Sequence, residues 1–345
     1  MQKIQELFDA NKQLNRKIES VVTFAAHSDE QLNEEIKEYV VTKKLHDNYV
    51  NVIDRIEEAF SDTAKEVGIW VSGFYGSGKS SFAKYLGYSL DSTILIDGVS
   101  FGDKLMSRIQ DEDLRLRHRA LVKHYDPLVI LIDMSTQSIA GKSSKVSDII
   151  YYETMKALGV TTSSDPKVLE YMLLVYEQDK YDQLCDFVKE NYHREWKDLQ
   201  DNGVFANRIL AKSAPILFPE LFSTEDDYNK MRVDSIENEE DRFKKIKRFV
   251  KRFKNKDRII FVLDEVGQFI AADEDLILNL QGIMHILKDN FKGDVWLIAT
   301  AQQTLTEDNP DAQVNSSQLY KLNDRFPIKV EIEADDIKDY MKLDK

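Results

Sequence analysis

The glycine-rich segment at residues 73–80 constrains the fold of this chain more than any other feature. It reads Gly-Phe-Tyr-Gly-Ser-Gly-Lys-Ser and fits the pattern Gly-x4-Gly-Lys-Ser/Thr. A buried-strand pattern at 67–72 precedes it, and a helical pattern at 79–90 follows it. Glycines let the backbone curl until several N–H groups converge on one anion, and a helix start adds its positive dipole end. The segment therefore predicts a strand–loop–helix unit that binds phosphate.

Two side chains of this segment supply chemistry that backbone amides do not. We expect Lys79 to reach the β- and γ-phosphates of a nucleoside triphosphate and the Ser80 hydroxyl to ligate Mg²⁺. The predicted cofactors are therefore ATP and Mg²⁺. A glycine-rich turn with an incidental lysine is the alternative. The residues expected to bind the cofactor here are Gly73, Tyr75, Gly76, Ser77, Gly78, Lys79, Ser80 and Ser81.

Four further segments predict strands. Residues 128–133, 259–263 and 295–300 are short, continuous apolar runs, which is typical of strands buried on both faces. Residues 328–332 alternate between apolar and polar, which predicts an edge strand. Helical patterns separate these runs. The alternation predicts an α/β fold with a parallel sheet that helices cover on both faces.

Residues 135–257 interrupt the alternation of strands and helices. They are mostly helical by pattern and too long for one crossover helix, so we expect a helical insertion into the nucleotide domain. The predicted organisation is an N-terminal helical segment, a first half of the core, the insertion and a second half of the core, at residues 1–60, 61–134, 135–257 and 258–345.

Two adjacent acids, Asp264 and Glu265, follow the predicted strand at 259–263. Open α/β sheets bind ligands at the carboxyl ends of their strands, so we expect both side chains beside the phosphates. Asp264 would hold Mg²⁺, directly or through water, and Glu265 would polarise the attacking water as a catalytic residue. Asp133, which ends another predicted strand, is the alternative for the magnesium role.

A polar side chain is expected at the end of the strand that begins at residue 295. Thr300 or Gln302 could hydrogen-bond the γ-phosphate or the attacking water, and the sequence does not choose between these two candidate catalytic residues. A simple polar cap on the strand is the alternative to both.

Arg325 stands just before the last predicted strand. An arginine delivered across a subunit boundary neutralises charge that develops on the transferred phosphoryl group, which raises the rate by about 10³ to 10⁵. Arg325 is therefore a further candidate catalytic residue. A salt-bridged arginine near the sheet edge is the alternative.

A basic segment at residues 242–258 holds ten basic residues and one acid. Its aromatic and aliphatic residues recur at helical spacing, which predicts an amphipathic basic helix. Such a helix could meet DNA phosphates or an acidic partner, or it could be a solvated helix packed on the core. A smaller basic cluster at 115–119 carries the same two interpretations.

The charge and cysteine content limit the possible partners. The formal net charge of −14 repels nucleic-acid phosphates unless positive charge is concentrated locally, so the composition does not support DNA binding. The single cysteine, Cys185, excludes an internal disulfide and a cysteine-rich zinc site. There is no signal-peptide pattern and no apolar run of membrane-spanning length, so we expect a cytoplasmic protein without membrane contact.

The ordered motifs resemble an AAA+ ATPase module over about residues 39–333. The resemblance implies a P-loop NTPase core with a five-stranded parallel sheet in the order 5-1-4-3-2. It implies ATP at a subunit interface, with Arg325 of a neighbour completing the site, and hence a homo-oligomer. It also places Tyr39, Val40 and Val41 against the adenine.

A closer resemblance is to the N-terminal part of the large P-loop protein of BREX phage-defence systems (BrxC/PglY type). The stretches at 14–22, 39–42 and 68–87 carry it. Members of that family are much longer, and an AAA+ lid would follow the last strand. We therefore expect this chain, which stops at Lys345, to be a fragment that comprises the ATPase core.

These resemblances imply that the chain binds ATP and ADP, hydrolyses ATP, and drives or regulates assembly of a DNA-acting antiviral complex with other BREX proteins. Two rival functions stay open. The chain could be an ATP-dependent scaffold with little turnover, or it could be a DNA translocase motor.

Overall fold

The structure is a computed structural model that describes residues 28–61, 67–109, 111–136, 145–231, 233, 238–302, 322 and 324–332. The stretch at 14–22 lies outside these residues. Within them, none of the helices is both long and apolar enough to cross a membrane.

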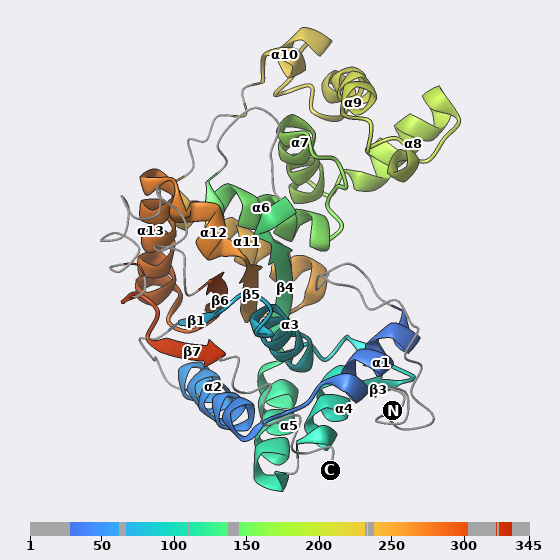
Figure 1. Cartoon of the computed structure of the whole chain (residues 1–345). Coiled ribbons are helices and arrows are strands. Elements are labelled where there is room, and N and C mark those ends of the chain that lie inside the picture. The colour runs from blue at the N-terminus through green and yellow to red at the C-terminus, as the bar shows by residue number, and fades with distance from the viewer. Residues whose placement is uncertain are drawn as a thin grey trace, which may run out of the picture.

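A five-stranded parallel sheet forms the centre of the chain (Figure 1). Its strands are β1 (Gly68–Gly73), β4 (Leu128–Asp133), β5 (Ile259–Asp264), β6 (Val295–Gln302) and β7 (Ile328–Ile332). Their order across the sheet is β4-β5-β6-β1-β7. The labels differ from the predicted numbering because β2 (Leu95–Ile96) and β3 (Val99–Ser100) form a separate hairpin that we did not predict. Numbered among themselves in chain order, the five strands read 5-1-4-3-2 from the β7 edge.

Helices cover both faces of the sheet, as the continuous apolar runs predicted. Side chains of β5 alternate between two cores: Ile259 and Phe261 face one, and Ile260 and Val262 face the other. The second core is closed by α1 (Asp29–Glu38), α2 (Lys43–Ser61), α3 (Lys79–Leu90), α4 (Phe101–Arg108) and α5 (Glu112–Tyr125). The first core is closed by α6 (Val146–Ala157), α11 (Glu239–Lys254), α12 (Val266–Ala271) and α13 (Glu274–Phe291).

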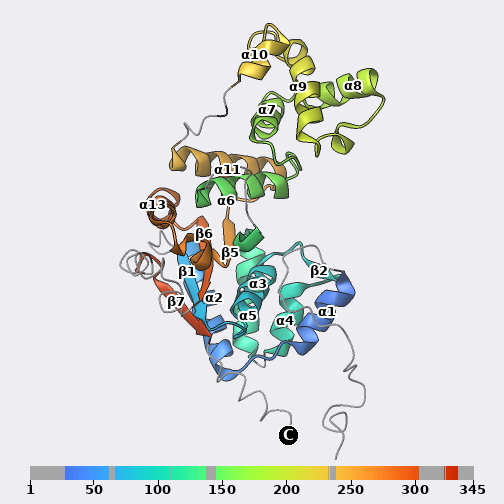
Figure 2. The same cartoon turned by 45° about the horizontal axis from the view of Figure 1, so that its top comes forward.

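Every described element between β4 and β5 is helical. After the 3-10 turn η2 (Met134–Thr136), α6 packs against α11, α13 and β4. In both views α7 to α10 lie beyond α6 and α11, on the side away from the sheet (Figure 2). These outer elements are α7 (Pro166–Glu177), α8 (Tyr181–Tyr192), η3 (Trp196–Asp198), α9 (Gly203–Leu217) and α10 (Glu225–Lys230).

Hydrogen bonds and an ion pair seat the helical segment on the core domain. The Arg242 guanidinium on α11 pairs with Asp148 on α6 and donates to the Ser147 hydroxyl at 3.2 Å. Asn279 on α13 accepts from the Ser147 amide at 3.2 Å and donates to Glu239 on α11 at 2.9 Å. Three helices that are distant in the sequence are therefore joined at one point beside the sheet.

Parallel pairing brings the carboxyl ends of all five strands to one edge of the sheet. Gly73 of β1 lies opposite Gln302 of β6, and Asp133 of β4 lies opposite Asp264 of β5. This edge is the one where open α/β sheets bind their ligands.

Candidate phosphate and magnesium site

The loop at 73–80 joins the end of β1 to the start of α3. Gly76 and Gly78 have φ angles of 76° and 93°, a left-handed backbone that side chains disfavour. Gly73 allows a close approach instead, because a Cβ there would lie 2.5 Å from the Ser77 hydroxyl and 2.5 Å from the Ile332 carbonyl oxygen. Three of the glycines in the predicted motif are thus required by the backbone path.

Lys79, the first residue of α3, is buried, with 5% of its surface exposed. Its ammonium forms no hydrogen bond or ion pair with any residue in the described ranges. Burial lowers its pKa, and the negative charges of Asp264 and Glu265 oppose that shift. The lysine therefore lies near the two predicted acids, with its hydrogen-bonding capacity free for a ligand.

Asp264 ends β5 and is also buried, at 5% exposure. Burial raises the pKa of its carboxyl group, while hydrogen bonds from Thr300 and Ser80 lower it. The Ser80 hydroxyl and the Asp264 carboxylate are thus neighbours, although Ser80 lies in the first turn of α3 and Asp264 ends β5. Hydroxyl and carboxylate oxygens are ligands that Mg²⁺ accepts.

Thr300 of β6 links the two acids. Its hydroxyl donates to the Asp264 carboxylate at 2.5 Å and accepts from the Glu265 backbone N–H at 2.8 Å. The side chain is fully buried. Between the two predicted candidates, Thr300 is therefore the one that contacts the acidic pair, whereas Gln302 is half-buried opposite Gly73.

Glu265 has a left-handed backbone, with φ 56° and ψ 19°, and stands immediately before α12. The Thr300 hydroxyl holds its N–H in this conformation. Burial raises the pKa of the Glu265 carboxyl group, and repulsion from Asp264 and Asp133 raises it further. A carboxylate with a raised pKa is a better proton acceptor, as a base that activates water requires.

Asp133 lies close to Asp264 and Glu265, although the sequence indicated it only as an alternative for the magnesium role. It lies in register with Asp264, and its charge acts on both acids of the predicted pair. One of its carboxylate oxygens accepts from the Ser135 N–H at 2.9 Å and from the Ser135 hydroxyl at 2.6 Å. Asp133 therefore caps the turn after β4 while adding negative charge to the site.

The loop at 73–80 carries side chains of differing exposure. The Ser77 hydroxyl is buried without a hydrogen-bond partner among the described residues. Tyr75 at the loop tip is 81% exposed. Ser81 follows in the first turn of α3 and is half-buried.

Tyr39, Val40 and Val41 lie between α1 and α2, on the α3 side of the sheet. The Tyr39 ring packs edge-on against Tyr85 of α3, with ring centroids 4.6 Å apart, and its hydroxyl lies 3.1 Å from that of Tyr49. All three predicted residues are half-buried. The segment thus touches the helix that begins in the candidate phosphate loop.

Arg325 lies away from this site within its own chain. It precedes β7, whose first residue Ile328 pairs with Ile69 near the start of β1. The loop at 73–80 follows the opposite end of β1. Arg325 is exposed and lines a hollow with Lys288 of α13. It cannot reach the phosphate site of its own chain.

The cations of the basic segment at 242–258 are mostly paired within the chain. Neighbouring carboxylates neutralise eight of the ten, so the structure favours a helix packed on the core over a free phosphate-binding surface. The pairs are Arg242–Asp148, Lys244–Glu240, Lys245–Glu170, Lys247–Asp294, Arg248–Glu177, Lys251–Asp257, Arg252–Asp179 and Lys256–Asp126.

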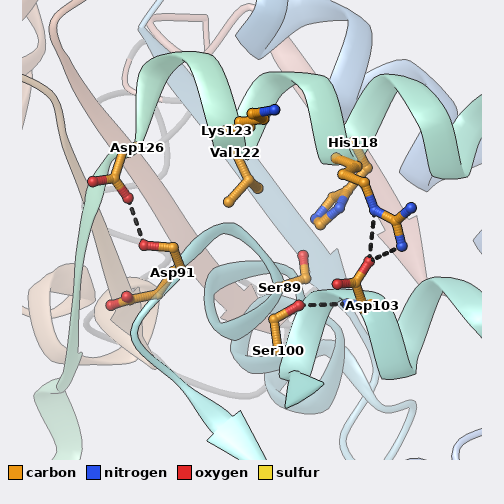
Figure 3. A pocket seen from close by; sticks show the side chains of 10 residues that line it. Ser89, Asp91, Ser100, Asp103, His118, Val122, Lys123 and Asp126 are labelled. Atoms are coloured by element: carbon orange, nitrogen blue, oxygen red, sulfur yellow. Dashed lines mark hydrogen bonds and ion pairs between the residues drawn. The ribbon is translucent and has the colours of Figure 1, made fainter. Parts of the chain in front are cut away.

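The smaller basic cluster on α5 is also satisfied internally. Arg119 holds Asp103 of α4 through two hydrogen bonds of 2.6 and 3.0 Å. Burial lowers the pKa of His118 to about 4, so this side chain is neutral. Figure 3 shows His118 and Asp103 on facing walls of a hollow of about 380 Å³ at the far end of α3. Arg115 and Arg117 pair with Glu112, Asp54 and Asp113.

No protein-family model matches the chain.

Proposed function

We propose that this chain is the ATPase core of an AAA+ type P-loop protein that binds Mg²⁺–ATP and hydrolyses it. One observation carries the proposal: Thr300 of β6 hydrogen-bonds Asp264, Ser80 of the glycine-rich loop lies close enough to lower the pKa of that carboxyl group, and the buried Lys79 lies near the same acid. A phosphate loop, a metal-binding pair and a carboxylate base converge on the carboxyl edge of a parallel sheet. This convergence is what nucleoside triphosphate hydrolysis requires.

Each residue has a defined role in the proposed reaction. The amides of the loop and Lys79 hold the phosphates and offset their charge, and Ser80 with Asp264 would hold the metal. When bound, Mg²⁺ neutralises charge on the phosphate oxygens. Glu265 accepts a proton from water, and Thr300 fixes the backbone from which Glu265 projects. Tyr39, Val40 and Val41 would contact the adenine.

Arg325 acts in a neighbouring copy in this proposal. Its position at the opposite end of β1 from the loop excludes a role at its own site. ATP turnover per chain should therefore rise with protein concentration and be lost in Arg325→Ala. Turnover that is independent of concentration and unaffected by the substitution would remove the shared site.

The proposed context is a BREX anti-phage protein, in which hydrolysis drives or regulates assembly of a DNA-acting complex with other system proteins. The stretches at 39–42 and 68–87 support it by their resemblance. A translocase motor is less well supported, because carboxylates of the chain already neutralise most cations of α11.

Glu265→Gln tests the function directly. We expect the turnover rate to fall by about 10² to 10⁴ while Mg²⁺–ATP affinity is retained, because only the base is lost. The matched control is Glu274→Gln, which makes the same change at an acid in the first turn of α13. A scaffold would keep its assembly activity in Glu265→Gln, and a protein without magnesium-dependent ATP binding would refute both functions.

A further inference from the structure

Glu35 of α1 connects two parts of the candidate nucleotide site. Its backbone carbonyl accepts the Tyr39 N–H at 3.0 Å, where the predicted adenine segment begins. Its carboxylate accepts from the Lys84 ammonium at 3.0 and 3.2 Å. Lys84 lies on α3 about 7.5 Å along the helix axis from Lys79. One residue thus holds both the base-binding segment and the helix that carries the phosphate-binding lysine.

The ion pair is shielded from water on the lysine side. The Lys84 side chain is 1% exposed and that of Glu35 is 29% exposed. The ammonium also lies 5.5 Å from the centre of the Tyr88 ring and 5.9 Å from that of Tyr85. A buried ammonium requires its partner, because an uncompensated charge in such surroundings is strongly destabilising. The pair therefore restricts where α1 can lie relative to α3.

The two ends of the segment at 39–42 are anchored differently. At its far end, the Thr42 hydroxyl accepts the Leu45 N–H at 3.2 Å and thereby caps α2, which begins at Lys43 and has a fully buried face. At its near end the segment continues α1, in which Leu32 and Ile36 are the buried residues. The near end thus depends on α1, and α1 is fastened to α3 by the side chain of Glu35.

We propose that the Glu35–Lys84 ion pair is a positioning element that fixes the base-binding segment at 39–41 relative to the phosphate loop. Nucleotides then bind to the chain more tightly than inorganic polyphosphates do. This inference rests on the proposed function. A ligand that bridges base segment and loop benefits when the two are held in place before binding, because binding does not have to order them. A ligand held by the loop alone gains nothing from the pair.

The double variant Glu35→Gln/Lys84→Met tests this inference. It removes the charges together, so neither is left buried without a partner. Calorimetry should show Mg²⁺–ATP binding weakened about tenfold, as expected when one segment must be ordered on binding, and Mg²⁺–tripolyphosphate binding changed less than about twofold. The matched control is Glu34→Gln/Lys37→Met, which removes an exposed 2.7 Å pair within α1 and should change neither affinity.

Glu35→Asp is the second variant, for use if the double variant does not fold. It keeps the charge that Lys84 needs but shortens the side chain, and it should weaken ATP binding selectively in the same way. Equal losses for ATP and tripolyphosphate, or no loss for either in a folded variant, would overturn the positioning role. Failure of the wild-type chain to bind either ligand would instead remove the proposed function itself.

Discussion

Replacing Thr300 by valine should destabilise the protein and slow hydrolysis together. Valine keeps the shape of threonine but removes the hydroxyl that donates to Asp264 at 2.5 Å and accepts from the Glu265 N–H at 2.8 Å. A hydrogen bond to a charged group contributes about 1.5–3 kcal/mol, and a buried N–H left without a partner costs about 1–3 kcal/mol. We therefore expect the free energy of unfolding to fall by about 3 kcal/mol.

The effect on turnover follows from the backbone of Glu265. Its left-handed conformation, with φ 56°, is one that a residue with a side chain adopts at a cost of about 1–2 kcal/mol. The Thr300 hydroxyl accepts the Glu265 N–H and so holds this backbone in place. Removing the hydroxyl lets the Glu265 carboxylate move. Displacing a catalytic group by about 1 Å lowers rates by about a hundredfold, which sets the expected loss in kcat.

Urea unfolding followed by tryptophan fluorescence gives the stability change, and ATP turnover gives the rate. Thr300→Ser is the matched control, because it keeps the hydroxyl and loses one methyl group, at a cost of about 1 kcal/mol. The reasoning fails if Thr300→Val unfolds within about 0.5 kcal/mol of the wild type, or if the serine and valine variants lose the same amount of activity.

Three further predictions concern buried charge. Lys79→Met should raise the Tm of the unliganded protein at pH 7 and abolish its stabilisation by Mg²⁺–ATP. Burial lowers the pKa of Lys79, so the charged lysine destabilises the fold at any pH below that pKa. An unchanged or lower Tm without ligand would contradict this. Glu265→Gln should raise the Tm at pH 8, and this gain in Tm should disappear near pH 4. A carboxyl pKa raised above its usual 4.5 makes the ionised form unfavourable in the folded state only above pH 4.5. Calorimetric scans between pH 4 and pH 8 measure the gain in Tm, and a gain independent of pH would refute the cause. Arg242→Met should lower the free energy of unfolding by about 3 kcal/mol, because it leaves Asp148 half-buried without its cation; Lys244→Met, which breaks an exposed pair on the same helix, is the control and should change stability by less than about 1 kcal/mol.

The sheet and its loop could be predicted from sequence because their signals are local. Strands β4 and β5 are buried on both faces, so each appears as an unbroken apolar run, and α3 begins at Lys79 as the glycine-rich pattern predicted. The hairpin of β2 and β3 was missed, because its two-residue strands are too short to show any periodicity. Predictions of ATP binding, hydrolysis and a defence role remain predictions.

The side-chain network of the candidate site could not be predicted, because it joins residues from distant parts of the chain. Thr300 and Gln302 project from the same face of one strand and differ only in depth along it. The register of β6 against β1 places Thr300 opposite Val71. Gln302 lies two residues nearer the carboxyl end of the strand, opposite Gly73. The Glu35–Lys84 pair likewise has no local sequence signal, since it depends on how two helices cross.

The helical segment between β4 and β5 also has a consequence for how the chain folds. These two strands pair in full register although the whole of α6 to α11 separates them in the sequence, and such distant contacts form slowly because a long loop must close first. In the folded protein, contact between α6 and α11, which Arg242 and Asp148 fasten, holds the two ends of that long connection close together. A connection whose ends are held together shortens the loop that must close when β4 pairs with β5. We therefore expect that weakening the contact between α6 and α11 slows refolding of the sheet as well as lowering its stability.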